Sequence, residues 1–150
     1  MTPSFQSTGP AAQENWLYKN KDKGMLAATA SLGMILLWDI DEGLVQLDKF
    51  MDSSDDNIIA GSYLAMGIVN CGIKNECDPV QAILLEKLEQ ATKQSHKIGA
   101  LMGLSLAYAG SARQDLLEAI SPIVLDSSNS IELQAVAAVS IGLIYVGTCD

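Results

Sequence analysis

The chain has 150 residues, of which 49% are hydrophobic, and this is enough for the ordered core of one ordinary domain. Its formal net charge of −9 argues against nucleic acid and anionic membranes as partners, because both favour basic patches, and it indicates a partner with a basic surface. No segment reaches the roughly 18 uninterrupted apolar residues that a membrane-spanning helix needs.

The N-terminal residues come before the first predicted helix. Residues 1–10 lack the basic start and the apolar run of a secretory signal, so we expect a disordered lead-in and an intracellular protein. Residues 11–20 are predicted to form a short helix in which Trp16 and Leu17 supply an apolar side. A polar break over residues 21–24 follows.

Two helices of different character come next. Residues 25–37 are apolar and rich in Ala, Thr and Ser, which predicts an inner helix that neighbouring backbones approach closely. Residues 42–51 are amphipathic, with Asp41 placed as the N-cap. At about 100° per residue, one side of this helix is apolar and another carries acids around a valine. The apolar side is Ile40, Leu44, Leu47 and Met51, and the acidic side is Asp41, Val45, Asp48 and Asp52.

The same alternation continues along the chain. A second inner helix is predicted over residues 59–72. Asp78 and Pro79 then start an outer helix that runs to about residue 92, with Asp78 as the N-cap and proline at the first helical position. The inward residues of this helix are Val80, Ile83, Leu84 and Leu88, and Ala82, Leu85, Glu86 and Glu89 are left near the opposite side.

The C-terminal third repeats the pattern once more. A third inner helix begins near His96, which we interpret as a surface or turn histidine. Pro122 is expected to kink or divide the next outer helix. The last inner helix ends at Gly147.

The four inner helices are copies of one pattern. One column of the alignment holds Gly33, Gly67, Ser105 and Gly142, a second holds Ser31, Ala65, Gly103 and Ser140, and Trp38, Gly72, Gly110 and Gly147 close the copies. The first column recurs at spacings of 34, 38 and 37 residues. Self-similarity at this period indicates stacked helical hairpins, so residues 11–150 are predicted to be an all-α superhelix of about three and a half hairpins. Neither end has a polar capping repeat, and we expect a piece of a longer array.

The three cysteines are Cys71, Cys77 and Cys149. Their odd number and uneven spacing favour reduced thiols over disulfides. His96 is the only further soft ligand, so we expect no metal site. Enzyme activity is also disfavoured, because the chain has one histidine and no GxSxG, no HExxH and no phosphate-binding glycine loop followed by lysine.

Inner helices of the pattern GxxLAxGxxxxG, alternating with acidic outer helices, resemble the proteasome/cyclosome repeats of the large scaffold subunits of the 26S proteasome regulatory particle. The strings ASLGMILLWDID at 30–41, GLVQLDKF at 43–50 and GIVNCGIKNECDP at 67–79 are similar to the non-ATPase base subunits that serve as ubiquitin receptors. The resemblance covers most of residues 15–150. It implies an arc of a closed toroid with two concentric helical layers.

The resemblance also implies a function. It implies a docking site, without cofactor, for ubiquitin, polyubiquitin and the ubiquitin-like domains of shuttle factors, on consecutive outer helices. Further implied partners are a deubiquitinase and, in the full-length protein, proteasomal ATPase subunits, in the cytoplasm and nucleus. Position by position, the central site helix carries Asp41, Asp48 and Asp52; the helix before it offers Glu14 and Tyr18, and the helix after it offers Leu85, Glu86 and Glu89.

The residues alone indicate a similar surface. Residues 39–56 hold seven acids against Lys49, a local charge of −6 out of −9. Ubiquitin and its mimics present an apolar patch ringed by basic side chains, so Val45 can be buried while acids pair around it. Such rim ion pairs contribute about 0.2–1 kcal/mol each, which predicts weak, salt-sensitive binding on the order of micromolar.

Structural interpretations of the same residues stay open. A charged outer face is often only a solvated face, and Asp41 as an N-cap and Asp55 and Asp56 in a turn have local roles. Tyr18 is as consistent with a half-buried anchor, and Leu85 with packing against the next outer helix. Lys49 is expected to pair with a neighbouring acid. The alternative function is a purely structural arc of the toroid that contacts other proteasome subunits.

Overall fold

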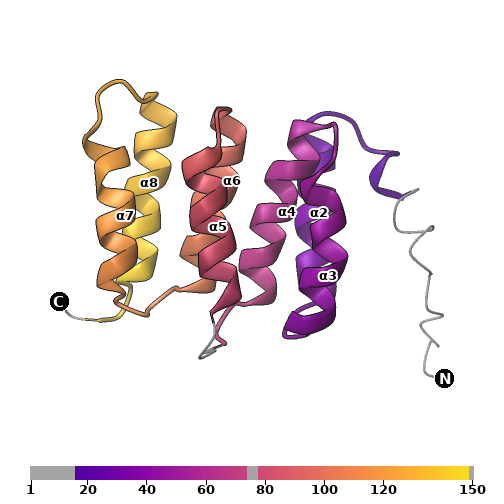
Figure 1. Cartoon of the computed structure of the whole chain (residues 1–150), viewed down its shortest axis with the longest axis horizontal. Coiled ribbons are helices and arrows are strands. Elements are labelled where there is room, and N and C mark those ends of the chain that lie inside the picture. Colours follow the sequence, from indigo (N-terminus) through magenta and orange to yellow (C-terminus); the bar gives the residue numbers. More distant parts are fainter. Residues whose placement is uncertain (1–15, 74–77, 149–150) are drawn as a thin grey trace.

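The computed structural model describes residues 16–73 and 78–148, and the regular structure within these ranges is helical. Residues 1–10, Glu14, Cys77 and Cys149 lie outside the described residues. Figure 1 shows the helices as a row of hairpins that runs from α2 at one end to α8 at the other. The helices are α2 (Lys23–Ile35), α3 (Ile40–Met51), α4 (Asp56–Val69), α5 (Pro79–Gln90), α6 (Gln94–Ala107), α7 (Gln114–Leu125) and α8 (Ile131–Ile144).

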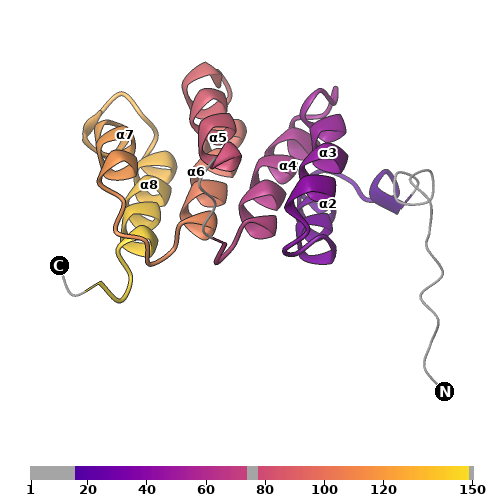
Figure 2. The ribbon, with the colours of Figure 1, turned by 60° about the horizontal axis from the view of Figure 1, so that its bottom comes forward.

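The helices form two layers. In the inner layer, α2 packs on α4, α4 on α6 and α6 on α8. Each outer helix packs mainly on the inner helix that follows it, so that α3 lies on α4, α5 on α6 and α7 on α8. Figure 2 separates the outer α5 and α7 from the inner α6 and α8. This arrangement confirms the predicted all-α superhelix of helical hairpins.

Small residues let the inner helices touch through their backbones. A Cβ placed on Gly33 would lie 2.5 Å from the carbonyl oxygen of Ala65, and one on Gly67 would lie 2.1 Å from that of Gly103. The first column of one copy therefore meets the second column of the next copy, as the sequence alignment indicates. A Cβ on Gly142, in the last copy, meets no described atom within 4 Å.

The outer helices bury the sides that the periodicity predicts. Leu47 of α3 is fully buried, and Ile40, Leu44 and Met51 pack against the core beside it. On α5, the buried residues are Val80, Leu84 and Leu88, with Ile83 packed against them. The apolar sides thus orient each outer helix on the inner layer, and the opposite sides face outward.

The predicted N-cap of α3 is wrong, and so is one of the two alternatives predicted for Pro122, the division of its helix. Helix α3 begins at Ile40 with Asp39 at the N-cap, so Asp41 lies in the first turn and is not the cap. Helix α7 continues through Pro122 to Leu125 and is not divided there. Pro122 lies in the last turn, where its missing N–H removes one backbone hydrogen bond, and its carbonyl still accepts the N–H of Asp126 at 3.0 Å.

The inner helices begin earlier than predicted. Helix α4 begins at Asp56, because the carboxylate of Asp55 accepts the N–H of Asn57 at 2.8 Å and caps the first turn. It ends at Val69, before Gly72 takes a left-handed φ of 77°. Among the helices of the described ranges, none is long and apolar enough to cross a membrane.

Candidate functional site

The outward side of α3 carries Asp41, Val45, Asp48 and Asp52, which we call the acidic stripe. All four residues are exposed, and Val45 has 66% of its surface accessible. Their common orientation follows from the burial of Leu47 on the other side of the helix. The structure therefore brings together the four α3 residues that the sequence assigns to the site.

Two other acids of this region, Asp55 and Asp56, have structural partners. Asp55 caps α4, and Asp56 accepts hydrogen bonds from the ammonium group of Lys93 at 2.6 and 2.8 Å. The hydrogen bond from Lys93 lowers the pKa of Asp56. These two carboxylates hold the chain at the start of α4, so they do not belong to a free binding surface.

His96 also belongs to this structural group. Its side chain is 15% exposed, its Nε2 lies 3.2 Å from Asp56 Oδ1, and its ring meets Tyr63 edge-on at 6.2 Å between centroids. The interpretation of His96 as a surface histidine is therefore wrong. This contact could not be predicted from the sequence, because Asp56 and His96 lie on different inner helices.

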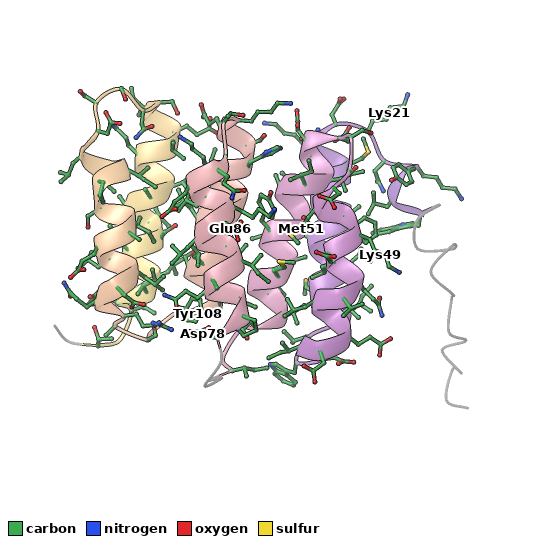
Figure 3. All side chains as sticks on the ribbon, in the orientation of Figure 1. Lys21, Lys49, Met51, Asp78, Glu86 and Tyr108 are labelled. Carbon is green, nitrogen blue, oxygen red and sulfur yellow. The ribbon has the colours of Figure 1, made fainter. Side chains whose placement is uncertain are left out.

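Within the described ranges, no ion pair or side-chain hydrogen bond involves Asp41, Asp48 or Asp52. The expected pairing of Lys49 with a neighbouring acid is also not present in this part of the chain. Figure 3 shows Lys49 on the side of α3 away from α5. The charges of the acidic stripe are thus available to a partner.

Asp48 and Asp52 occupy positions at which negative charge destabilises α3. Asp48 lies in the last turn of α3, and Asp52 takes the C-cap position. Negative charge at a helix C-terminus opposes the helix dipole, and two acids four residues apart repel each other. The charges of Asp48 and Asp52 therefore do not stabilise α3.

The residues proposed on α5 are placed differently from one another. Glu86 and Glu89 are exposed, and Gln90 donates a hydrogen bond to Glu86 at 2.9 Å. Leu85 is half-buried and lines a cavity of about 250 Å³ together with Ala119 and Ile123 of α7. Leu85 therefore faces α7 across this cavity, which Glu89 also lines, and Glu86 and Glu89 are exposed charges of α5.

The short helix predicted over residues 11–20 is described only from residue 16 onward. Tyr18 is 59% exposed, so its side chain is not a half-buried anchor, whereas the adjacent Leu17 is completely buried. Glu14 lies outside the described residues. Of the two site residues predicted here, the structure places Tyr18 at the surface.

A cluster of hydrogen-bonded polar side chains around Arg113 was not predicted from the sequence. Arg113, at the start of α7, contacts Asp78 and donates hydrogen bonds to both carboxylate oxygens of Asp115, at 2.7 and 3.1 Å. The hydroxyl of Tyr108 donates to Asp78, and these two residues lie together at the N-terminal end of α5 in Figure 3. This arginine cluster, completed by Gln81, ties α5 and α6 to α7. Asp78 looked like a simple helix cap because its partners lie 30 and 35 residues away.

The charges of the arginine cluster support each other. Hydrogen bonding to Arg113 lowers the pKa of Asp115 to about 2, and the bond to Asp115 raises the pKa of Arg113. Burial, followed by the bond to Asp78, raises the pKa of Tyr108. Because Arg113 holds both carboxylates by hydrogen bonds and ion pairs, the cluster is suited to holding helices together.

We expect Arg113→Met to lower the free energy of unfolding by about 1–3 kcal/mol, because it leaves the mostly buried carboxylate of Asp78 without its charged partner. Urea denaturation followed by helical circular dichroism measures the change. Lys49→Met, which removes the same charge from an exposed position, is the control and should stay within about 0.5 kcal/mol. Equal effects of the two substitutions would contradict a role for the cluster in stability.

The acid dependence of stability gives a second measurement. The pKa of Asp115 is about 2 in the folded chain and 3.8 as a reference, so its stabilising contribution is complete above the reference value. It is lost as the pH falls from 3.8 towards 2. The Arg113→Met variant should lose less stability than the wild type over this interval.

Metal ligation has no candidate site in the described part of the chain. There, no three His, Cys, Asp or Glu side chains come together as ligands would. Cys71 is half-buried and free.

Comparison with known proteins identifies the family. No protein-family model matches the sequence. The 26S proteasome non-ATPase regulatory subunit 2 of Dictyostelium discoideum is 39% identical over 135 residues, which are 90% of this chain and 15% of that protein. The 26S proteasome regulatory subunit rpn1 of Schizosaccharomyces pombe is 47% identical over 136 residues, or 91% of this chain and 15% of that protein. The chain belongs to this family of proteasome regulatory subunits.

Other members of the proteasome-subunit family match parts of the chain more closely. Homolog A of the 26S proteasome non-ATPase regulatory subunit 2 from Arabidopsis thaliana is 60% identical over 76 residues, which are 51% of this chain and 8% of that protein. The chain spans about 15% of the length of the Dictyostelium and Schizosaccharomyces relatives.

Proposed function

We propose that this chain provides a non-catalytic docking surface for ubiquitin, polyubiquitin and the ubiquitin-like domains of shuttle factors, with the acidic stripe of α3 at its centre. The observation that carries the proposal is that Asp48 and Asp52 are exposed and form no ion pair with another described residue, at the end of the helix where negative charge is unfavourable. Residues that break a local rule of stability are expected at functional sites.

The chemistry of the acidic stripe fits such a partner. Val45 is an exposed apolar residue with acids on both sides of it along the helix. A partner whose apolar patch is ringed by basic groups can bury Val45 and pair with the acids at the rim. Exposed ion pairs of this kind are weak, so the affinity for one ubiquitin is on the order of micromolar.

The neighbouring outer helices enlarge the surface. Glu86 and Glu89 on α5, and Tyr18 before α2, are exposed on either side of α3 along the array. A row of outward helices allows a ubiquitin chain to engage more than one of them, which raises avidity without new contacts at any single site. A deubiquitinase with a ubiquitin-like domain would use the same surface. In the whole protein, proteasomal ATPases are further partners, in the cytoplasm and nucleus.

The test is a titration of isotopically labelled chain with ubiquitin, followed by NMR. The amide signals of Val45, Asp48 and Asp52 are expected to shift, and those of Gly67 and Gly103 to stay nearly still, because these glycines are buried between inner helices. No shift at millimolar ubiquitin would overturn the proposal.

A structural role is the second candidate, and one observation favours it. Helix α8 has an exposed face, on which Val139 is 56% exposed and a Cβ on Gly142 would meet no described atom within 4 Å. A stacking face of this kind suits a helical array whose contacts are with other protein layers. Unchanged α3 amides in the ubiquitin titration would leave this role as the function of the chain.

A further inference from the structure

Trp38 has an unusual backbone conformation for a large side chain. It follows α2 at the position that closes the repeat, and its φ is 72°. The other three repeats place a glycine there, with φ of 77° at Gly72, 70° at Gly110 and 76° at Gly147. In the left-handed region a Cβ crowds the following carbonyl oxygen, so glycine is the residue that the turn itself favours. Tryptophan at this turn is therefore not explained by the backbone.

Packing does not explain Trp38 either. Its side chain is 70% exposed, so burial does not offset the strain of the turn. The corresponding glycines differ in their surroundings: a Cβ on Gly72 would meet no described atom within 4 Å, and one on Gly110 would lie 3.3 Å from the carbonyl oxygen of Val146. Packing among the described residues therefore does not account for a tryptophan at this turn.

The turn holds Trp38 in a fixed position. Its backbone N–H donates to the carbonyl of Val69 at 3.2 Å, and the next N–H, of Asp39, donates to Leu36 at 3.0 Å. The first hydrogen bond links the backbone of Trp38 to the end of α4, so the turn is fixed to the inner layer of helices. A surface aromatic residue on a fixed backbone loses little conformational entropy when it is covered by a partner.

The surroundings of Trp38 repeat the chemistry of the acidic stripe. Leu37 is exposed beside it, and Asp39, Asp41 and Glu42 follow at once, all exposed. Three Cα–Cα steps keep the backbone of Trp38 within about 11 Å of that of Asp41. The turn thus places exposed apolar residues and three acids directly before the acidic stripe in sequence, a composition that suits one partner with an apolar patch and a basic rim.

We propose that Trp38 is an apolar anchor of the ubiquitin-binding surface, so that this surface extends from α3 onto the α2–α3 turn. The inference rests on the function proposed above. Interface energy is concentrated in a few aromatic and arginine anchors surrounded by near-neutral polar contacts. Val45 offers only a small apolar area to a partner. Trp38 supplies a large apolar area, whose burial adds to the weak binding energy of the ion pairs at the rim.

The test uses two variants and one fluorescence measurement. Trp38→Gly gives the turn the residue of the other repeats, and Trp38→Asn keeps a side chain that tolerates the left-handed region. Both should fold as well as the wild type, with an unchanged or higher urea midpoint, and bind ubiquitin at least about tenfold more weakly. In a Trp16→Phe chain, tryptophan-free ubiquitin should protect Trp38 from quenching by acrylamide and shift its emission to the blue.

The outcomes separate this inference from the proposed function. If ubiquitin shifts the amides of Val45 and Asp48 but the Trp38→Gly variant binds like the wild type, Trp38 is not an anchor and the function of α3 stands. Weaker binding without protection of Trp38 from acrylamide would also overturn the inference, since it would mean an indirect effect of the turn. If ubiquitin changes no signal of the chain, both proposals fall.

Discussion

Gly67→Ala is expected to lower the free energy of unfolding by about 1–3 kcal/mol, although alanine is the better helix former by about 1 kcal/mol. The reason is the contact between α4 and α6. A Cβ on Gly67 would lie 2.1 Å from the carbonyl oxygen and 2.4 Å from the Cα of Gly103, and both are backbone atoms that no rotamer change can move. The two helices must separate, and the core contacts between them weaken.

Gly142→Ala is the matched control for this substitution. Gly142 occupies the same column of the repeat, and like Gly67 it lies in the last turn of its helix, but an added Cβ there meets no described atom within 4 Å. Only helix propensity changes, so the variant should be more stable by about 0.5–1 kcal/mol. Urea denaturation of both variants measures the difference. Stabilisation by both alanines would show that α4 and α6 are not in backbone contact.

The repeat could be predicted from the sequence because close backbone contact restricts residue type. Positions such as Gly33 and Gly67 accept only small residues, and this leaves a periodic trace in the chain. The inward sides of α3 and α5 could also be predicted from the sequence, since helical periodicity alone places Leu47 and Leu84 in the core. The outward direction of the acidic stripe then follows without further information.

Which acids are free could not be predicted, because pairing depends on residues that are distant in sequence. Asp56 meets Lys93 across 37 positions, and Asp78 meets Arg113 across 35. From their neighbours in sequence alone, both carboxylates are interpreted as turn or cap residues. Likewise, Trp38 was aligned with three glycines, but its exposed and left-handed state is a property of the folded turn.

The double substitution Asp48→Lys and Asp52→Lys is expected to weaken ubiquitin binding by about ten- to a hundredfold. Each reversal removes an attraction of about 0.2–1 kcal/mol and adds a repulsion of similar size, and about 1.4 kcal/mol corresponds to tenfold in affinity. The helix itself should not suffer, because lysines at the C-terminus of α3 complement the helix dipole. Loss of binding with retained or improved stability would separate the binding role of the two acids from a structural one.

The control for charge reversal is Glu118→Lys with Glu132→Lys, on α7 and α8 at the other end of the array, which changes the net charge by the same amount. This control should bind ubiquitin nearly as the wild type does. Raising the salt from about 0.05 M to about 0.5 M should weaken wild-type binding but not that of the α3 variant, because salt screens the attractions of the wild type and the repulsions that the lysines introduce. Equal losses in the two double variants would mean that overall charge governs binding, and the acidic stripe would then have no special role. Titration by NMR distinguishes these results, since only a local site shifts the amides of α3 selectively.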